Sequence, residues 1–330
     1  MPKVLGRGFD SRRLHQKLNY KTMLTFQRPK LVLSRCFFDH VRYDGGIIID
    51  PFVEKLKSYV DVITVCPEMD IGLGTPRQRI IVLKEAKGRK LFQPETGKDL
   101  TATMEDFANK FLLNLEEVDG FLLKSKSPSC GVGTTKLYEG DKVIGRTYGM
   151  FAQKVKENLP YIPLEDEGRL NDIRIREHFL TRVYAFADLR RLKHSFSSKA
   201  LVEFHSSYKY LLMTYNQSAL KKLGQIVSRV GKEPEKALKA YEEVFRSAFS
   251  KMPSPSKHAN TLLHILGHIS RRLNSMEKKH IIHLIQKVKH GRISYRLVVE
   301  IIRNIAYRYE EKYLLKQRYF DPFPEELLED

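Results

Sequence analysis

Residues 30–36 read KLVLSRC and residues 61–66 read DVITVC, so two short apolar runs each end at a cysteine. A third run, GFLLK at residues 120–124, stands six residues before another cysteine, Cys130. Short apolar or β-branched runs of this length are typical of buried strands. Between the first two runs, residues 52–59 have helical spacing, which predicts a strand, helix, strand unit with parallel strands.

The rest of the first half extends this unit. Residues 103–115 and 149–159 are predicted helices, and residues 78–83 and 89–92 are a predicted hairpin that turns at residues 87–88. Strands that alternate with helices are the mark of an α/β domain. We therefore predict a domain over residues 30–163 with a Rossmann-like, mainly parallel sheet.

From Asp166 onward no strand pattern persists, and helical periodicity takes its place. Helices are predicted over seven stretches: 179–192, 199–215, 218–230, 234–250, 258–273, 277–289 and 294–317. This predicts an all-α domain over residues 164–330. Residues 1–29 are basic and lack a clear apolar period, so we expect a flexible basic arm there.

The composition is that of a folded chain with a basic bias. Its 330 residues are 42% hydrophobic and 29% charged, with a formal net charge of +19. At about 150 residues per domain this length suggests two domains and excludes a disulfide-stapled miniprotein. The charged fraction of only 29% excludes a disordered polycation. No apolar run reaches the roughly 18 residues of a membrane span, and no apolar signal-peptide core opens the chain. We expect a cytoplasmic protein without a membrane partner.

The basic excess and the cysteines lie in different segments. Residues 1–30 carry eight basic and one acidic residue (+7), residues 31–170 carry 20 and 21 (−1), and residues 171–330 carry 30 and 17 (+13). A basic domain joined to a near-neutral one is typical of a polyanion-binding module attached to a catalytic module, with surface charge for solubility as the alternative. Three tyrosines of the helical half could stack on RNA bases, although their spacing favours the core: Tyr208, Tyr210 and Tyr215.

The three cysteines, Cys36, Cys66 and Cys130, each lie at or shortly after the end of a predicted strand. Because the carboxyl ends of parallel strands share one edge of a sheet, these side chains can converge there. Three thiolates in one crevice suggest a soft metal centre, zinc or iron and sulfur, with one position open for a substrate. Buried structural cysteines are the alternative. Polar, turn-forming residues flank each cysteine, which favours a site.

The residues around the cysteines resemble a known family, the 2-thiouracil desulfidases. The resemblance covers roughly residues 30–159 and rests on four motifs: VRYDG at 41–45, CPE at 66–68, GLGTPR at 72–77 and KSKSPSCG at 124–131. The second half resembles the YbgA-like helical domain fused to it, on three segments: FHSSYKY at 204–210, HAN at 258–260 and YLLKQ at 313–317. This fusion is similar to the bacterial desulfidases that act on 4-thiouridine in transfer RNA.

The resemblance implies a cofactor and a mechanism. The three cysteines would hold a [4Fe-4S] cluster with one iron open, and that iron would polarise the thiocarbonyl sulfur of the substrate. Water would then replace the sulfur without electron transfer. Glu68 is the candidate for proton transfer, and Ser125 and Ser127 are candidates for positioning the base or the water, with turn capping as their alternative. Arg42 and Asp44 are expected to orient the loop after the first cysteine through an ion pair.

We therefore expect a non-redox, iron-sulfur desulfidase that converts a thiolated uracil, above all 4-thiouridine in transfer RNA, to uridine. The basic helical domain would deliver the RNA to a near-neutral active site. The alternatives are a desulfidase of free 2-thiouracil and a non-enzymatic, metal-containing RNA-binding protein that senses oxidation. Arg35 before the first cysteine and FFDH at residues 37–40 after it depart from the small or aliphatic residues usual in the family. This departure concerns the shape of the base pocket more than the cluster.

Overall fold

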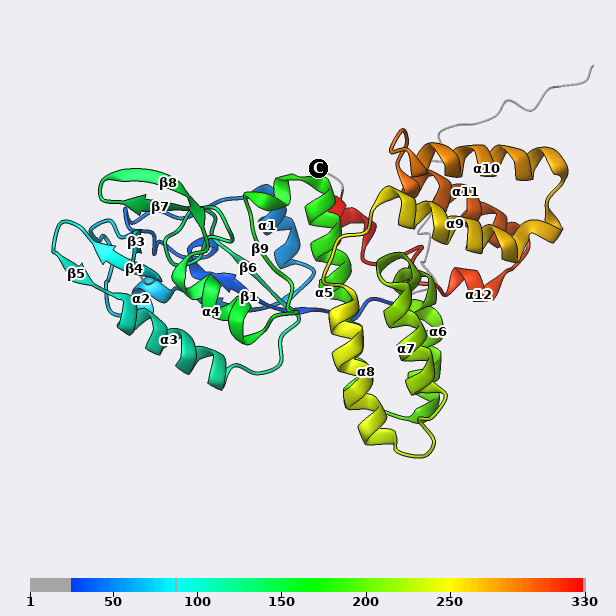
Figure 1. The fold of residues 1–330 in the computed structure, drawn as a ribbon, viewed down its shortest axis with the longest axis horizontal. Helices are drawn as coiled ribbons and strands as arrows, with labels where there is room; N and C mark the ends of the chain where they lie inside the picture. The colour runs from blue at the N-terminus through cyan, green and yellow to red at the C-terminus, as the bar shows by residue number, and fades with distance from the viewer. Residues whose placement is uncertain (1–24, 87, 329–330) are drawn as a thin grey trace, which may run out of the picture.

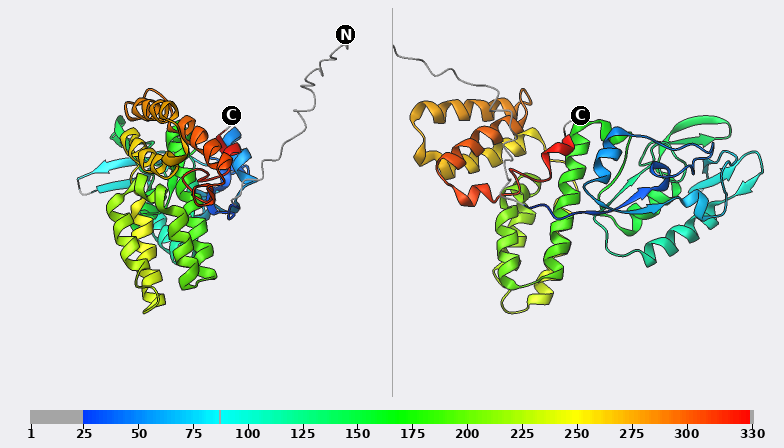
Figure 2. Two further views of the ribbon diagram at one scale, coloured as in Figure 1. Left: turned by 90° about the vertical axis from the view of Figure 1, so that its right-hand side faces the viewer. Right: turned by 180° about the vertical axis from the view of Figure 1, so that it is seen from behind.

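The computed structural model describes residues 25–86 and 88–328. The chain forms an α/β lobe and a helical lobe, and the long helix α5 (Ile173–His194) stands between them (Figure 1). The view from behind shows the same side-by-side arrangement (Figure 2). This confirms the predicted fold class, an α/β region with a parallel sheet followed by an all-α part.

The centre of the α/β lobe is a four-stranded parallel sheet in the order β2-β1-β6-β9. Three of its strands match the predicted apolar runs: β1 (Lys30–Ser34), β2 (Asp61–Val65) and β6 (Gly120–Leu123). The fourth, β9 (Leu164–Asp166), pairs with β6 and lies beyond residue 163, where the sequence analysis ends the domain. A strand of three residues with one apolar side chain gives too short a pattern to be recognised in the sequence.

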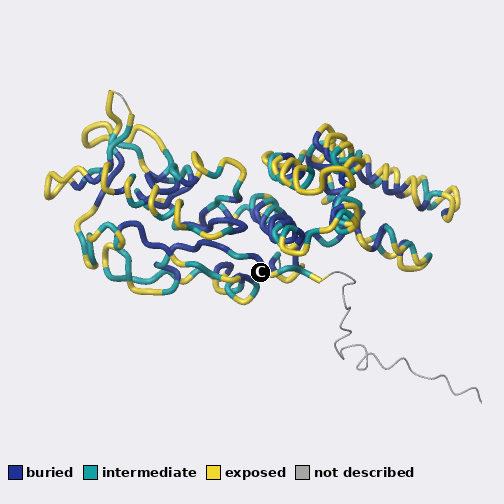
Figure 3. The backbone as a smooth tube through the Cα atoms, turned by 90° about the horizontal axis from the view of Figure 1, so that it is seen from below, coloured by how far each residue is buried: buried dark blue, intermediate teal, exposed yellow. Residues whose placement is uncertain are grey.

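Helices cover both faces of this sheet. Consecutive strand residues point to opposite faces, so in β1 the side chains of Leu31 and Leu33 pack on one side and that of Val32 on the other. The first face is covered by α1 (Pro51–Lys57) and α5, and the second by α3 (Thr101–Asn114) and α4 (Met150–Asn158). The buried backbone, dark blue in Figure 3, follows the strands and α5 through the middle of the molecule.

A second, five-stranded sheet in the order β5-β4-β3-β7-β8 lies in the same lobe. β3 (Ile81–Glu85) and β4 (Gly88–Gln93) form the predicted hairpin, although residue 87 of its turn lies outside the described residues. β7 joins β3 in parallel, and the other pairs are antiparallel. Three of these strands are not predicted from the sequence: β5 (Lys98–Asp99), β7 (Thr135–Glu139) and β8 (Lys142–Thr147). β8 is exposed almost throughout, so it lacks the alternation of a half-buried strand.

The second half of the described chain is helical, as predicted. After α5 the helices are α6 (Ser198–Tyr215), α7 (Gln217–Val227), α8 (Pro234–Ala248), α9 (Pro255–Ile269), α10 (Ser275–Lys289), α11 (Tyr295–Arg308) and α12 (Lys312–Leu315). The predicted single helix over residues 294–317 is wrong, because Glu310 adopts a left-handed conformation (φ 53°) that ends α11. This turn lets Leu314 and Leu315 reach the core.

The three tyrosines considered for base stacking are core residues. Tyr208, Tyr210 and Tyr215 are at most 5% exposed and pack among the helices of the second lobe. Aromatic side chains at helical spacing usually cover a core, and here the burial leaves no ring surface for an RNA base. Stacking by these tyrosines is therefore excluded.

Helix α5 belongs to the cores of both lobes. Phe179 and Val183 pack with the parallel sheet, whereas Phe186 and Leu189 pack with the helices of the second lobe. The two predicted domains thus share one helix along their boundary. None of the helices within residues 25–86 and 88–328 combines the length and the apolar character needed to cross a lipid bilayer.

The predicted flexible arm is described only from residue 25. Phe26 lies edge-on to Tyr184 of α5, with ring centroids 5.7 Å apart, and Arg28 donates to the Asp61 carboxylate at 2.7 Å. The end of the arm is therefore packed against the folded chain. The prediction for residues 1–24 lies outside the described residues.

A buried ion pair ties α5 to the parallel sheet. The side chain of Asp119, just before β6, is fully buried and accepts from Arg190 of α5 at 2.8 Å and from the Lys30 N–H at 2.8 Å. Replacing Arg190 by Met leaves this carboxylate without its cation, so we expect the free energy of unfolding to fall by about 3–5 kcal/mol. Urea denaturation followed by circular dichroism measures the loss.

Arg174→Met is the control for this prediction. Arg174 also starts from α5 and pairs with Asp172, but its side chain is 78% exposed. An exposed ion pair contributes little to the free energy of unfolding, so this variant should leave the denaturation midpoint unchanged. Equal midpoints for the Arg174 and Arg190 variants would contradict the importance of the buried pair.

Candidate functional site

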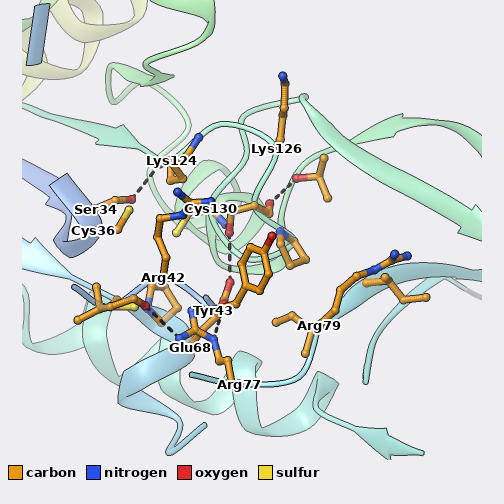
Figure 4. Close-up of a pocket in the computed structure, with 18 of the residues that line it drawn as sticks. Ser34, Cys36, Arg42, Tyr43, Glu68, Arg77, Arg79, Lys124, Lys126 and Cys130 are labelled. Atoms are coloured by element: carbon orange, nitrogen blue, oxygen red, sulfur yellow. Dashed lines mark hydrogen bonds and ion pairs between the residues drawn. The ribbon is translucent and has the colours of Figure 1, made fainter. Parts of the chain in front are cut away.

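The carboxyl ends of β1, β2 and β6 open into a cavity of about 500 Å³. Residues that follow these strands form one wall, and β3 and β7 of the second sheet contribute the other, including Val82 and Thr135. Figure 4 labels several of the side chains that line it, among them two of the cysteines, Cys36 and Cys130, and three arginines and two lysines. A cavity of this volume is in the range of small-molecule binding sites.

All three cysteines line this cavity. The structure thus brings them together at the ends of the parallel strands, as expected from the sequence. Cys36 lies in the turn of 3-10 helix after β1, Cys66 occupies the N-cap of the short helix α2 (Pro67–Asp70), and Cys130 lies in the loop after β6. They are 8%, 8% and 5% exposed, and none is in a disulfide. Their position is that of a ligand site at the carboxyl edge of a parallel sheet.

Burial makes these thiols weak acids. It raises the pKa of Cys36 to about 12, with a further contribution from Cys66, while the Lys124 ammonium lowers this pKa. Burial also raises the pKa of Cys66, and it raises the pKa of Cys130 well above its ordinary value, with Glu68 adding to the effect. Three neighbouring thiolates repel one another, so a bound cation is needed to hold them deprotonated together.

Three thiols around one cavity are donors of the kind that an iron-sulfur cluster or another soft metal centre binds. In a [4Fe-4S] cluster each thiolate binds a different iron, so its ligands stand farther apart than those of one zinc. Three buried thiols around one cavity would leave the fourth iron without a protein ligand.

Glu68 lies in the cavity wall near the start of α2. Its Oε2 accepts from Arg77 Nε at 2.8 Å, and its Oε1 accepts from the Ser127 hydroxyl at 3.2 Å. The Arg77 side chain is 5% exposed and also donates to the carbonyls of Val41 and Gly74. The ion pair therefore fixes the Glu68 carboxylate at the wall, and Oε1 retains the capacity to accept another hydrogen bond.

Both candidate serines lie in the loop after β6 and line the cavity, and their hydroxyl groups have different partners. Ser127 Oγ accepts from the N–H groups of Ser129 and the following cysteine at 3.2 and 3.1 Å, as in turn capping. Ser125 Oγ donates to Glu167 at 2.6 Å and accepts from Lys124 at 3.0 Å. The Ser127 contacts therefore fit turn capping, whereas the Ser125 hydroxyl is held by a carboxylate and an ammonium.

Two of the sequence motifs meet beside the cavity. Arg42 pairs with Asp44 at 2.9 Å, which confirms the ion pair expected in this loop. The Thr75 hydroxyl donates to the carbonyl of Arg42 at 2.7 Å, and the Arg77 N–H donates to that of Tyr43 at 2.8 Å. Tyr43 is 52% exposed, and its ring lies among the other labelled side chains in Figure 4. An accessible aromatic ring therefore stands where a base could stack.

The cavity wall carries an excess of positive charge although residues 31–170 are near neutral. Seven Lys and Arg side chains line it, against one carboxylate. Four of the seven are paired with carboxylates: Arg35, Arg42, Arg77 and Lys124. The other three are exposed and have no carboxylate partner within residues 25–86 and 88–328, and we call them the cationic rim: Arg79, Lys126 and Lys136. The expectation of a near-neutral active site is therefore wrong.

Several of these residues are missing from the sequence-based candidates. Arg77, Lys124 and Lys126 lie inside the motifs GLGTPR and KSKSPSCG. The basic residues of these motifs could therefore have been recognised as site candidates from the sequence. Glu167 approaches the site only through the pairing of β9 with β6. Lys136 does so through the pairing of β7 with β3, and neither pairing has a local sequence signal.

The fold and the site define a class of protein, a Rossmann-like α/β domain with three buried cysteines at the carboxyl edge of its sheet, fused to an all-α domain. Residues 31–167 match the family described as 2-thiouracil desulfurase, and residues 209–324 match a family described as a protein of unknown function, DUF1722. The match to the 2-thiouracil desulfurase family thus lies in the α/β domain, and the DUF1722 match lies in the helical domain that follows it. This confirms the family resemblance carried by the motifs.

Known proteins match parts of the chain. YbgA of Escherichia coli (strain K12), described as uncharacterized, is 28% identical over 160 residues, which are 47% of this chain and 94% of that protein. YbbK of Bacillus subtilis (strain 168), also described as uncharacterized, is 28% identical over 141 residues, 40% of this chain and 91% of that one. A solved structure described as the [4Fe-4S]-dependent thiouracil desulfidase TudS is 26% identical with a TM-score of 0.35, covering 44% of this chain and 95% of that one.

Proposed function

We propose that the protein is a [4Fe-4S]-dependent desulfidase that converts 4-thiouridine in transfer RNA to uridine. The observation that carries the proposal is the cavity, which is lined by three buried thiols, a buried carboxylate and the cationic rim. In the net reaction water supplies the oxygen that replaces sulfur, the C–S bond breaks, and the sulfur leaves as sulfide. Oxidation states do not change, so no electron donor is required.

Each part of the cavity has a task in this proposal. The three cysteines hold the cluster, whose iron without a protein ligand supplies a Lewis acid for the thiocarbonyl sulfur. Glu68 accepts a proton from the attacking water at Oε1, and Arg77 keeps the carboxylate in one orientation. Tyr43 stacks on the thiolated base at the mouth of the cavity.

The charge distribution supports a nucleic-acid substrate over a free base. A free thiouracil has no phosphate, whereas the cationic rim can bind phosphates that flank a base. Lys126 of the rim has a φ of 60° and is held by a hydrogen bond from its N–H to the Thr134 hydroxyl at 3.0 Å. Strain of this kind in a residue other than glycine is typical of functional positions. The charge of the helical domain, +13 over residues 171–330, favours the same substrate class.

Anaerobic assays test the proposal. The protein is purified and reconstituted without oxygen, then incubated with thiolated transfer RNA and, separately, with free 2-thiouracil, while the thiocarbonyl absorbance is followed. Loss of absorbance from the RNA supports the proposal. Turnover of the free base without turnover of the RNA would eliminate transfer RNA as the substrate. Inactivity toward both would leave the redox-sensor alternative.

Removing the cationic rim is expected to weaken RNA binding. The triple variant Arg79→Gln, Lys126→Gln, Lys136→Gln should raise KM for thiolated transfer RNA roughly tenfold to a hundredfold and lower the slope of log KM against log salt by about two. KM for free 2-thiouracil should move far less, because that substrate has no phosphate. Steady-state kinetics over a salt series measure both quantities.

A matched triple variant separates local from total charge. Lys84→Gln, Lys98→Gln, Lys142→Gln removes the same charge from exposed strand positions that do not line the cavity. Its KM for the RNA should stay within about twofold, since only charges close to the bound phosphates displace counterions. If the two triple variants raise KM for the RNA equally, total charge and not the cationic rim determines RNA binding.

A further inference from the structure

Two consecutive carboxylates at the end of β9 bind the loop that carries Cys130, and neither lines the cavity. Asp166, which is fully buried, accepts from the Val132 N–H at 2.9 Å and from the Thr134 hydroxyl at 2.6 Å. Both donors follow the cysteine in the chain. Asp166 therefore fixes the part of the loop downstream of Cys130.

Glu167, which is 8% exposed, binds the upstream part of the same loop. It accepts from the N–H and the hydroxyl of Ser125, both at 2.6 Å, and from the Lys124 ammonium at 2.5 Å. Ser125 and Lys124 both line the cavity. Glu167 thus holds two side chains of the cavity wall, although it does not line the cavity itself.

The pairing of β9 explains how two neighbouring residues reach both parts of the loop. β9 runs parallel to β6 with Asp166 opposite Leu123, so the chain leaves both strands at one edge of the sheet. Asp166 is the last residue of β9, and Glu167 begins the turn that follows the strand. Gly168 then passes so close to Ser125 that an added Cβ would lie 3.1 Å from the Ser125 Cβ. The segment is packed directly against the loop.

We propose that Asp166 and Glu167 are positioning residues of the site. Asp166 sets the place of Cys130, and Glu167 sets the places of Ser125 and Lys124 on the cavity wall. This deepens the proposed function and rests on its assignment of the cavity. The same segment leads directly into α5, so the link between the two lobes also supports the site.

Hydrogen exchange on the full chain tests these contacts directly. Glu167→Gln should speed exchange of the Ser125 amide, and Asp166→Asn that of the Val132 amide, each by roughly tenfold or more. Glu165→Gln is the matched control, because Glu165 lies on the same strand and its side chain pairs with Arg169, which is outside the loop that carries Cys130. Unchanged exchange in the first two variants, or an equal change in the control, would overturn the proposal.

Iron release and kinetics test the consequence for the site. After anaerobic reconstitution, Asp166→Asn should lose iron to a chelator at least about fivefold faster, and Glu167→Gln should lower kcat at least about tenfold with KM within about twofold. Faster exchange with unchanged iron release and kcat would overturn the positioning role. If wild-type protein desulfurises no thiolated uracil, the proposed function fails, while exchange and iron release still decide this inference.

Two milder variants keep the test valid if Asp166→Asn or Glu167→Gln does not fold. Thr134→Val removes one donor to Asp166, and Ser125→Ala removes one donor to Glu167 while its N–H remains. Each should speed exchange of the loop amides in the same direction and by a smaller factor. Exchange at the wild-type rate in both would overturn the proposal.

Discussion

Replacing Cys130 by alanine is expected to abolish both iron retention and desulfuration. The Cys130 side chain is 5% exposed in the cavity wall, in a loop that Ser127 and Asp166 bind through its main chain. Without this thiolate a cluster would keep two protein ligands, too few for a stable [4Fe-4S] centre. Iron analysis after anaerobic reconstitution should fall from about four irons per chain to below about one, and turnover should be undetectable.

Ser129→Ala is the matched control for this prediction. The Ser129 hydroxyl is buried and has no hydrogen-bond partner in the part of the chain that the structure describes, so alanine removes an oxygen and no hydrogen bond. This variant should keep its iron and its turnover. Turnover retained by Cys130→Ala would contradict the ligand assignment, and a colourless wild-type protein with zinc in place of iron would contradict the cluster.

Local patterns predicted the parallel strands of the site because their signals are local. KLVLS and DVITV are short apolar runs between turn-forming residues, and the observed strands β1 and β2 cover residues 30–34 and 61–65. The convergence of the cysteines followed from the parallel arrangement alone, since parallel strands end at one edge. The backbone that carries the three thiols could therefore be derived from residue order and strand type.

The rest of the cavity depends on contacts between segments that are distant in the sequence. β7 contributes Thr135 and Lys136 to the wall because it pairs with β3, and Glu167 reaches Ser125 because β9 pairs with β6. β9 has one apolar residue, and β8 is exposed almost throughout, so neither strand shows a periodic pattern of apolar residues in the sequence. Register and pairing of such strands are set by the whole sheet.

The net charge summed over a segment of sequence was a poor guide to the charge of the site. Residues 31–170 sum to −1, and this predicted a near-neutral site. The cavity nevertheless collects seven of the basic side chains around one lining carboxylate, while the acidic residues that balance the sum lie largely outside its wall. The cationic rim and the helical domain can therefore act on one polyanion together. The helical domain is then not needed to bring positive charge to a neutral site.

Glu68→Gln is expected to lower kcat by roughly a hundredfold to ten-thousandfold, with KM changed less than about threefold. Glutamine keeps the size of the side chain and can still accept from Arg77, but it cannot take a proton from water at the cavity wall. Iron content and the denaturation midpoint of each preparation are measured beside the kinetics. The rate can then be expressed per folded, iron-loaded chain.

Arg77→Lys distinguishes proton transfer from loop support. It keeps a cation opposite Glu68 but loses the guanidinium contacts to the carbonyls of Val41 and Gly74, so it should lower the denaturation midpoint. Because the carboxylate remains, its kcat should fall by less than about tenfold, far less than in Glu68→Gln. If Arg77→Lys loses as much kcat as Glu68→Gln, Glu68 acts by holding the two motif loops together. Proton transfer would then have to come from another group in the cavity, or from the substrate itself.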